Sequence, residues 1–403
     1  MTDNKTDFTD NIATVASAID PFHVMKILAE AKQLEAQGKD VIHMEIGEPD
    51  FPSPECVHDA AIAAAQKGLT HYTPTLGLPE LRQKLAAFYH KFYNAQVDSN
   101  QIIVTPGSSS ALQLVLTSIL NPQDKVLTAD PTYPCNRQFV KLLHADILAV
   151  PVSHETQYQL NLELIKHHWR NDIKAVMVAS PANPTGTIIE QDELLKMAEF
   201  LSQNNAYLIV DEIYQGLIYD RPAESILAQT QIASFSNVIV INSFSKFFGM
   251  TGWRLGWTVV PEHLIPILDR LGQNLFLSAP TPSQYGALAV LEEDALAILE
   301  ERRQIFEQRR NTLIKSMQNA GFSIKTLPQG AFYLYWDVSN LTNNSQTFCS
   351  DLLNKTGVAI TPGLDFGESG ANQHVRIAYT CDEDKILQAV SKIVEFCKAQ
   401  NSA

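Results

Sequence analysis

Cysteine is scarce in this chain of 403 residues, and the few cysteines follow no paired spacing. There are five, and no two are spaced as C-x-x-C: Cys56, Cys135, Cys349, Cys381 and Cys397. An odd and scattered set argues against a disulfide framework and against a structural zinc site. We therefore expect free thiols, no metal site, and a cytoplasmic protein in a reducing compartment.

Long apolar runs and basic blocks are also missing. Residues 1–10 are polar and acidic and carry no apolar signal region, and no run approaches the roughly 18 apolar residues of a membrane span. The chain has 30 Lys and Arg against 44 Asp and Glu, a net charge of −14. Such a surface repels phosphate backbones and anionic lipids, so we expect no nucleic acid or membrane partner. Any anion site must be built locally.

Two further absences bear on organisation and function. No G-x-G-x-x-G turn follows the first predicted strands, which removes the main support for a nicotinamide dehydrogenase. No internal repeat and no Pro-, Gly- and Ser-rich linker divides the chain into autonomous halves. The length still exceeds one ordinary core, so two domains are expected.

Short apolar runs alternate with helical patterns through the middle of the chain. Strands are predicted at residues 102–105, 125–129, 147–150, 174–179, 207–210, 238–242 and 255–260. Helices are predicted between many of them, for example at 109–120 and 191–204. Apolar runs without polar alternation are typical of strands covered on both faces. The pattern predicts an α/β domain with a mostly parallel central sheet flanked by helices.

The two ends of the chain have a different texture, which predicts a smaller α+β domain. An amphipathic helix is expected from Pro21 to about Gly38, then a short strand at 41–46. After Pro280 the expected elements are a long helical stretch at 287–318, strands at 332–336, 358–361 and 375–378, and helices at 346–355 and from Asp384. We predict an N-terminal arm at 1–20, a small domain formed by 21–50 and 290–403, and a large domain at 51–289.

Several segments that follow the predicted strands could carry chemistry, because the carboxyl ends of parallel strands gather functional loops. Strand 102–105 leads into Ser108 and Ser109 at a helix start, where backbone N–H groups can surround an anion; a plain serine N-cap is the alternative. Strand 174–179 leads into a Pro- and Gly-containing turn that includes Asn183, which could equally be a bare turn. Strand 207–210 ends in paired carboxylates at 211–212, which are costly to bury unless a cation meets them.

Lys246 stands among small and apolar residues after the strand at 238–242. Serines precede it, and Arg254 follows eight positions later. A lysine in such surroundings can lose its proton readily and act as an amine nucleophile. A surface lysine that extends its charge into water is the alternative.

Together these segments resemble the class I/II pyridoxal-phosphate-dependent aminotransferases of the aspartate aminotransferase fold (fold type I). The matching segments are 46–51 (Ile-Gly-Glu-Pro-Asp-Phe), 183–186 (Asn-Pro-Thr-Gly), 211–214 (Asp-Glu-Ile-Tyr), 243–246 with Arg254, and 375–377. The resemblance implies an enzyme that moves an amino group from an L-amino acid to a 2-oxo acid by a ping-pong mechanism. Alternatives are a pyridoxal-phosphate-dependent C–S lyase or another reaction on the same scaffold, and a non-catalytic regulator that keeps the fold.

The resemblance also implies roles around the ring of the cofactor, pyridoxal 5′-phosphate. Lys246 would bind the cofactor as a Schiff base and move the substrate proton. Asp211 would meet the pyridinium nitrogen, where a carboxylate favours the protonated ring. Tyr214 and Asn183 would hydrogen-bond the phenolic oxygen, and Tyr133 would stack on the ring.

The cofactor phosphate would lie among the side chains of Ser108, Ser109, Ser243, Ser245 and Arg254. The planar fork of donors on an arginine suits a phosphate.

The substrate α-carboxylate would be held by Arg376, with help from Asn183 and the backbone at Gly47. Tyr72 would reach the phosphate of a neighbouring subunit, so the resemblance implies a homodimer. No Arg or Lys occurs at 273–276, which weakens the case for strict aspartate specificity. Arg137 could approach the substrate or lie at the surface, and residues 21–23 could form a mobile cover over the site.

Overall fold

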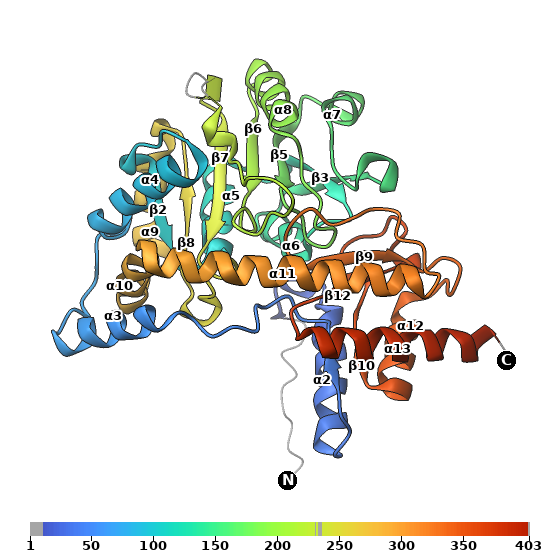
Figure 1. Cartoon of the computed structure of the whole chain (residues 1–403). Helices are drawn as coiled ribbons and strands as arrows, with labels where there is room; N and C mark the ends of the chain where they lie inside the picture. The colour runs from blue at the N-terminus through green and yellow to red at the C-terminus, as the bar shows by residue number, and fades with distance from the viewer. Residues whose placement is uncertain (1–10, 230, 233–235, 402–403) are drawn as a thin grey trace, which may run out of the picture.

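The computed structural model describes residues 11–229, 231–232 and 236–401, and a seven-stranded sheet lies at its centre (Figure 1). The strand order is β2-β8-β7-β6-β5-β3-β4. The bounds are β2 Ile102–Thr105, β3 Lys125–Asp130, β4 Asp146–Pro151, β5 Ile173–Ala179, β6 Tyr207–Asp211, β7 Val238–Ser243 and β8 Gly256–Val259. β8 is antiparallel to both of its neighbours, whereas the ladders from β7 to β4 are parallel. The predicted mostly parallel α/β sheet is confirmed.

Helices cover both faces of this sheet, which explains the uninterrupted apolar runs. Along β6, Leu208 and Val210 pack into the layer that contains α4, α8 and α10, while Ile209 packs into the layer that contains α5 and α9. The helices of this part are α3 Glu55–Gln66, α4 Pro79–Tyr93, α5 Ser108–Ile119, α6 Pro134–Leu142, α7 Leu162–His168, α8 Gln191–Gln203, α9 Ile265–Leu275 and α10 Thr281–Val290. Because most residues of the strands other than the edge strand β4 are buried on one face or the other, polar alternation along them would leave unpaired groups inside.

A second apolar cluster joins the first helix to the C-terminal part of the chain. It contains residues of α2 (His23–Ala36) together with residues of the last three helices, α11 Glu293–Asn319, α12 Ser345–Thr356 and α13 Glu383–Asn401. Two small sheets lie here, β11-β12-β9 and β1-β10. Their strands are β1 Ile42–His43, β9 Tyr333–Asp337, β10 Val358–Ala359, β11 Thr361–Pro362 and β12 His374–Ala378. The expected smaller α+β part is present, but the domain boundaries at residues 50 and 290 stay a prediction.

Three predicted elements differ in extent from the structure. The strand expected at 41–46 has only two paired residues, because the chain then leaves the sheet. The strand expected at 358–361 is two short strands in different sheets. The long helix expected at 287–318 is broken between α10 and α11, where Glu292 is extended with φ −77° and ψ 155°. No Gly or Pro marks this break; α10 packs against α3, and α11 starts with the acidic residues Glu293 and Asp294.

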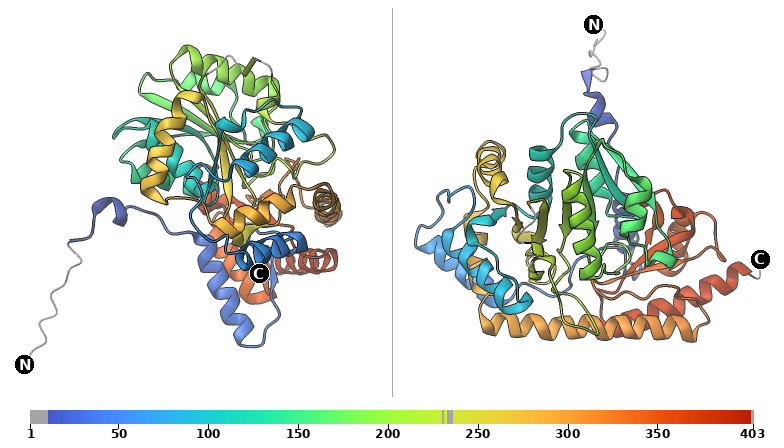
Figure 2. Two further views of the ribbon diagram at one scale, coloured as in Figure 1. Left: turned by 90° about the vertical axis from the view of Figure 1, so that its left-hand side faces the viewer. Right: turned by 90° about the horizontal axis from the view of Figure 1, so that it is seen from above.

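Helix α11 runs alongside both parts of the molecule (Figure 2). Within the described residues, the first helix is the one-turn helix α1 Thr14–Ser17, which packs near α6. Residues 1–10 of the predicted arm lie outside the described residues. None of the helices described here combines the length and the apolar character needed to cross a membrane.

Candidate functional site

Neighbouring strands of the large sheet bring the predicted residues to one edge. Asp211 is the last residue of β6, and Ser243 is the last residue of β7. Gly256 at the start of the antiparallel β8 pairs with both Thr105 and Ser243, so the residues before β8 lie at the same edge as the residues after β2 and β7. This pairing places Arg254 beside the start of α5.

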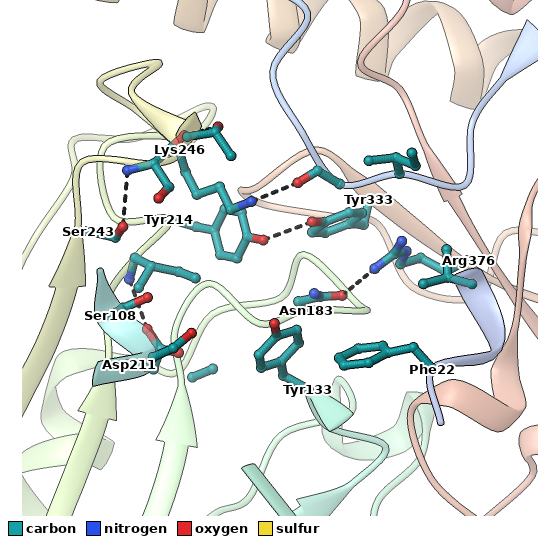
Figure 3. A pocket seen from close by; sticks show the side chains of 18 of the residues that line it. Phe22, Ser108, Tyr133, Asn183, Asp211, Tyr214, Ser243, Lys246, Tyr333 and Arg376 are labelled. Carbon is teal, nitrogen blue, oxygen red and sulfur yellow. Dashed lines mark hydrogen bonds between the residues drawn. The ribbon is translucent and has the colours of Figure 1, made fainter. Parts of the chain in front are cut away.

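A cavity of about 260 Å³ lies at this edge, between the large sheet and the C-terminal part (Figure 3). Its lining includes every predicted site residue of this chain except Tyr72: Gly47, Ser108, Ser109, Tyr133, Asn183, Asp211, Tyr214, Ser243, Ser245, Lys246, Arg254 and Arg376. Tyr72 is instead 80% exposed and lies outside the cavity of its own chain.

The amine of Lys246 projects into the cavity and donates to the carbonyl of Gly47 at 2.7 Å (Figure 3). Withdrawal from water lowers the pKa of Lys246 to about 8, opposed by the charge of Glu48 and assisted by Arg376 and Arg254. An ordinary lysine has a pKa of roughly 10.4. A much larger fraction of this amine is therefore neutral near pH 7, as a nucleophile or a base requires.

Asp211 is a buried carboxyl group that faces the same cavity. Its Oδ1 accepts a hydrogen bond from the backbone N–H of Ile213 at 3.1 Å, and the nearby charge of Lys246 also favours its ionised form. Burial raises the pKa of Asp211 to about 7. A carboxyl group left in this state is suited to a cationic N–H group of a ligand, because such a partner would restore its ionised form.

The neighbouring Glu212 has a different environment, although the sequence pairs the two carboxylates. It is buried and accepts from the hydroxyl of Ser225 at 2.8 Å and from the backbone N–H of Ile226 at 3.0 Å. Burial raises the pKa of Glu212 to about 7. The expected cationic partner is thus replaced by neutral donors, and this carboxyl group fixes the loop at 225–226 rather than lining the cavity.

An anion-binding corner is formed by α5, the end of β7 and Arg254. The first residues of α5 present backbone N–H groups and the hydroxyls of Ser108 and Ser109, and an N-terminal helix end favours negative charge. A Cβ atom added to Gly107, which has φ +84°, would lie 2.7 Å from Nη2 of Arg254. Gly107 therefore allows the guanidinium to lie against the start of the helix. The guanidinium is exposed, and its Nη1 donates to the carbonyl of Thr251 at 3.0 Å.

Arg376 is buried at the opposite side of the cavity. Its Nη1 donates to Oδ1 of Asn183 at 3.0 Å, and its Nη2 donates to Oγ1 of Thr361 at 3.2 Å and to the carbonyl of Glu45. The guanidinium carbon lies 4.4 Å from the centre of the Tyr333 ring. All of these partners are neutral, and Nε has no partner among the described residues. A buried guanidinium held in this way retains its charge for an anionic ligand.

Sequence reasoning did not identify Tyr333, although it connects the two sides of the cavity. Its hydroxyl lies 2.8 Å from that of Tyr214, and both rings are buried. A Cβ atom added to Gly47 would lie 1.8 Å from this hydroxyl, so Gly47 leaves the space that Tyr333 occupies. The aromatic run from Phe332 to Trp336 predicts only a buried strand, and nothing in it distinguishes Tyr333 from Tyr335.

Phe22 also lines the cavity, with its ring centre 6.4 Å from that of Tyr133 (Figure 3). Mobility of this segment stays a prediction. Arg137 lines a different cavity on the far side of Phe22 and donates to the carbonyl of Phe366.

Comparison with known proteins adds independent findings. Residues 39–393 match the profile of the family described as aminotransferase class I and II. The chain is 37% identical over 375 residues to a (5-formylfuran-3-yl)methyl phosphate transaminase of Methanocaldococcus jannaschii, covering 93% of this chain and 96% of that one. It is 34% identical over 393 residues to a valine–pyruvate aminotransferase of Mycobacterium tuberculosis, covering 97% and 100%. A solved aminotransferase structure from Mycobacterium tuberculosis superposes with a TM-score of 0.92 at 33% identity, covering 97% and 100%.

Proposed function

The chain belongs to the aminotransferase class I and II family, and we propose that the cavity described above is its active site. The protein is a pyridoxal-phosphate-dependent aminotransferase, which moves an amino group from an amino acid to a 2-oxo acid in two half-reactions. The observation that carries the assignment of the site is the convergence of Lys246, Asp211 and Arg376 on one cavity.

The residues present fit pyridoxal 5′-phosphate. The buried Asp211, whose pKa is raised by burial, suits the ring nitrogen, and the corner formed by Arg254 and the start of α5 suits the phosphate. Tyr214 and Asn183 would hydrogen-bond the phenolic oxygen, and Tyr133 would lie against the ring. Ser243 and Ser245 would complete the phosphate site. When bound, the cofactor withdraws electrons from the α-carbon of the amino acid, so that the α-proton can leave.

Lys246 is proposed to hold the cofactor covalently and, once released, to move the substrate proton. Its amine is close to half neutral at pH 8, the value to which withdrawal from water lowers its pKa. The neutral Nζ takes the proton from the α-carbon of the amino acid. The carbonyl of Gly47, 2.7 Å away, orients the amine when nothing else occupies the cavity.

Arg376 is proposed to bind the α-carboxylate, so that the α-carbon is placed near Lys246. Its position is fixed by Asn183, Thr361 and the carbonyl of Glu45, and fixed donors lower the entropic cost of orienting a substrate. The backbone at Gly47 would assist on the other side. Because Arg376 supplies a local positive charge inside the cavity, an enzyme with a net charge of −14 can bind an anionic group there.

We also propose that the enzyme is a homodimer in which Tyr72 of each subunit reaches the phosphate site of the other. Large exposed apolar side chains support this proposal: Leu69, Tyr72, Leu275 and Leu277. Their segments lie together, since the hydroxyl of Thr281 donates to the carbonyl of His71 at 2.7 Å. Sedimentation at equilibrium tests the dimer, and a lower affinity of Tyr72→Phe for the cofactor tests the contact.

Two further proposals concern organisation and location. The segments 21–50 and 290–403 are proposed to form the small domain and 51–289 the large one, in keeping with the two groups of apolar clusters. Hydrogen exchange that differs as a unit between these segments would test the division. A cytoplasmic location is proposed because all five cysteines are free thiols; fractionation of cells tests it.

The activity is tested by two sequential spectra. An amino acid added to the enzyme with pyridoxal phosphate should replace the visible band by that of pyridoxamine phosphate, and a 2-oxo acid should restore it. Release of ammonia and pyruvate without pyridoxamine phosphate would instead indicate a lyase and contradict the proposed use of this site.

A further inference from the structure

One side of the cavity is apolar and comes from the start of helix α2 and the residue before it. Four side chains form this apolar wall: Phe22, Val24, Met25 and Leu28. Met25 is 57% exposed and therefore leaves most of its apolar surface in contact with water. Covering such surface is favourable by about 25 cal/mol per Å². An apolar group of a ligand that covered these side chains would therefore bind favourably.

The fold itself does not use these side chains for its core. Helix α2 buries a different face, formed by Ile27, Ala31 and Leu34, against the C-terminal part of the chain. Residues 24 and 28 are one turn apart and share the face that points to the cavity. Helix α2 therefore has one broad apolar side, and packing against the core explains only the part formed by Ile27, Ala31 and Leu34.

The apolar wall is fixed at both of its ends. The carboxylate of Asp365 accepts from the backbone N–H groups of His23 at 2.5 Å and Val24 at 2.7 Å, which caps the start of α2. On the other side, Asp20 pairs with Lys141 of α6 at 2.9 Å. Phe22 lies between these two anchors; its ring centre is 6.4 Å from that of Tyr133, and it lines the same cavity as Arg376 (Figure 3).

The cations of the cavity are already assigned. Among the described residues that line it, the Lys and Arg residues are Lys246, Arg254 and Arg376. In the proposed function the first two bind the cofactor, and Arg376 binds the substrate α-carboxylate. The acidic residues of the lining are Glu45, whose carboxylate is bonded to His43, and Asp211, which is assigned to the cofactor, so neither offers a cation to a second carboxylate. Arg137 lies behind Phe22 in its own cavity and is already engaged with a carbonyl group.

We propose that the apolar wall is the binding site for the substrate side chain and that the preferred amino donors carry large apolar side chains, aromatic or branched aliphatic. The inference rests on the proposed function, because Arg376 must hold the α-carboxylate for the side chain to meet Phe22. A side-chain carboxylate, as in aspartate or glutamate, would instead meet apolar carbon with no free cation in the described lining.

The test is a set of single half-reactions with the enzyme loaded with pyridoxal phosphate. L-Phenylalanine, L-leucine, L-alanine, L-aspartate and L-glutamate are added singly, and the second-order rate constant for loss of the visible band is measured. Phenylalanine and leucine should exceed aspartate by at least about tenfold, since a mismatched polar group in an apolar pocket is strongly disfavoured. Calorimetry, which does not depend on turnover, should show that 3-phenylpropanoate binds more tightly than succinate.

Variants assign the preference to the wall. Phe22→Ala and Met25→Ala should each lower the rate constant for phenylalanine by about tenfold and that for alanine by less than about threefold, because the alanine methyl group is too short to reach the wall. Leu387→Ala is the matched control, since Leu387 is 47% exposed, lies on α13 and is outside the cavity lining. It should leave both rate constants unchanged.

The outcomes separate the inference from the function on which it rests. The inference is overturned if the rate constant for aspartate or glutamate equals or exceeds that for phenylalanine; the active-site assignment would still stand. If Arg137→Gln then lost the preference for the acidic substrate, Arg137 would be the cation that binds its side chain. Equal losses for phenylalanine and alanine in Phe22→Ala also overturn it. If no amino acid converts the cofactor, the proposed function fails and the inference fails with it.

Discussion

The hydroxyl groups of Tyr214 and Tyr333 lie 2.8 Å apart inside the active-site cavity, and the ring of Tyr333 also lies 4.4 Å from the guanidinium of Arg376. Tyr333 therefore contacts one residue proposed to bind the cofactor and one proposed to bind the substrate. With Tyr214 donating to the cofactor, the shared hydrogen bond must run from Tyr333 to Tyr214. A donor that also accepts a hydrogen bond is the stronger donor.

Tyr333→Phe should raise the pKa at which the visible band of the bound cofactor titrates. The change removes the hydroxyl but keeps the ring beneath Arg376, and one lost hydrogen bond of about 1 kcal/mol corresponds to a shift of roughly 0.7 units. Spectra recorded against pH measure it, and KM should change by less than about threefold. Tyr219→Phe is the control, because Tyr219 is a buried tyrosine outside the cavity lining. An unchanged pKa of the visible band in Tyr333→Phe would mean that Tyr333 does not influence the cofactor through Tyr214.

Attachment of the cofactor to cofactor-free enzyme should become faster with rising pH through about 8. Only the neutral amine of Lys246 reacts, and withdrawal from water lowers the pKa of this group to about 8. The observed rate should rise up to about tenfold per pH unit below pH 8 and level off above it. Stopped-flow absorbance measures the rate. A rate that keeps rising to pH 10 would mean that this amine is not perturbed.

Asp211→Asn should stabilise the cofactor-free protein at pH 8 while weakening cofactor binding. Burial raises the pKa of Asp211 to about 7, so the folded state binds more protons than the unfolded state between pH 4 and 7, and stability decreases as the pH rises through this window. Removing the charge should raise the melting temperature at pH 8 by roughly a few degrees. At pH 4 the carboxyl group is protonated in the folded state and still about half protonated in the unfolded state, so most of this difference should be gone. Calorimetric melting at the two pH values tests this, and a variant less stable at pH 8 would contradict it.

His43 should stabilise the fold below neutral pH and support Arg376 indirectly. Its hydrogen bond at 2.8 Å to the buried Glu45 raises the pKa of His43 to about 9, and Glu35 faces its other nitrogen. The contribution is complete below about pH 6.5 and is lost as the pH rises through 9. His43→Ala should cost about 2 kcal/mol at pH 6, because it leaves Glu45 buried without its cationic donor. The cost should be much smaller at pH 10, where His43 of the wild type is already largely neutral.

The same variant should raise KM more than it lowers kcat, because the carbonyl of Glu45 accepts from Arg376. Glu35→Gln is the control and should cost less than about 1 kcal/mol, as expected for a pair at the surface. Denaturant unfolding at pH 6 and 10, with steady-state kinetics, measures both effects. Equal destabilisation at both pH values would exclude an ionic role for His43.

Gly107→Ala should weaken cofactor binding by more than tenfold. The added methyl group would lie 2.7 Å from Nη2 of Arg254 and displace the guanidinium from the proposed phosphate site. Gly38→Ala is a matched control: Gly38 has φ +82°, close to the +84° of Gly107, but no atom lies within 4 Å of the added group. Gly107→Ala should also lose more stability than Gly38→Ala, because Gly107 has ψ 164° and lies in a backbone region that essentially only glycine adopts. Equal cofactor affinity in the two variants would argue against phosphate binding at Arg254.

The sequence predicted the large sheet well because most of its strands are buried on two faces and show as plain apolar runs; the edge strand β4 is mostly exposed or half-buried but is also apolar in sequence. It also predicted the polar residues at strand ends, since Asp211, Ser243 and Lys246 follow such runs directly. The helix break at Glu292 was missed because no Gly or Pro marks it; the acidic pair Glu293 and Asp294 in the first turn of α11 was its only local signal.

Residues that come from the small elements were harder to predict. Helix α2 shows one amphipathic pattern in the sequence, and Val24 and Leu28 fit it as well as Ile27 and Ala31 do. Only the structure separates the residues that face the core from those that face the cavity. For the same reason, the sequence alone could not identify Tyr333 as a cavity residue: β9 carries aromatic residues on both of its faces.

The central claim is that this cavity holds pyridoxal phosphate on Lys246. The most direct measurement is reduction of the loaded enzyme with borohydride, followed by digestion and mass spectrometry, alongside the visible spectrum of Lys246→Ala. The account predicts that the reduced cofactor is attached to the peptide at Lys246 and that the variant lacks the visible band of the lysine-bound cofactor. Attachment to a different lysine, or a band that persists in Lys246→Ala, would contradict it.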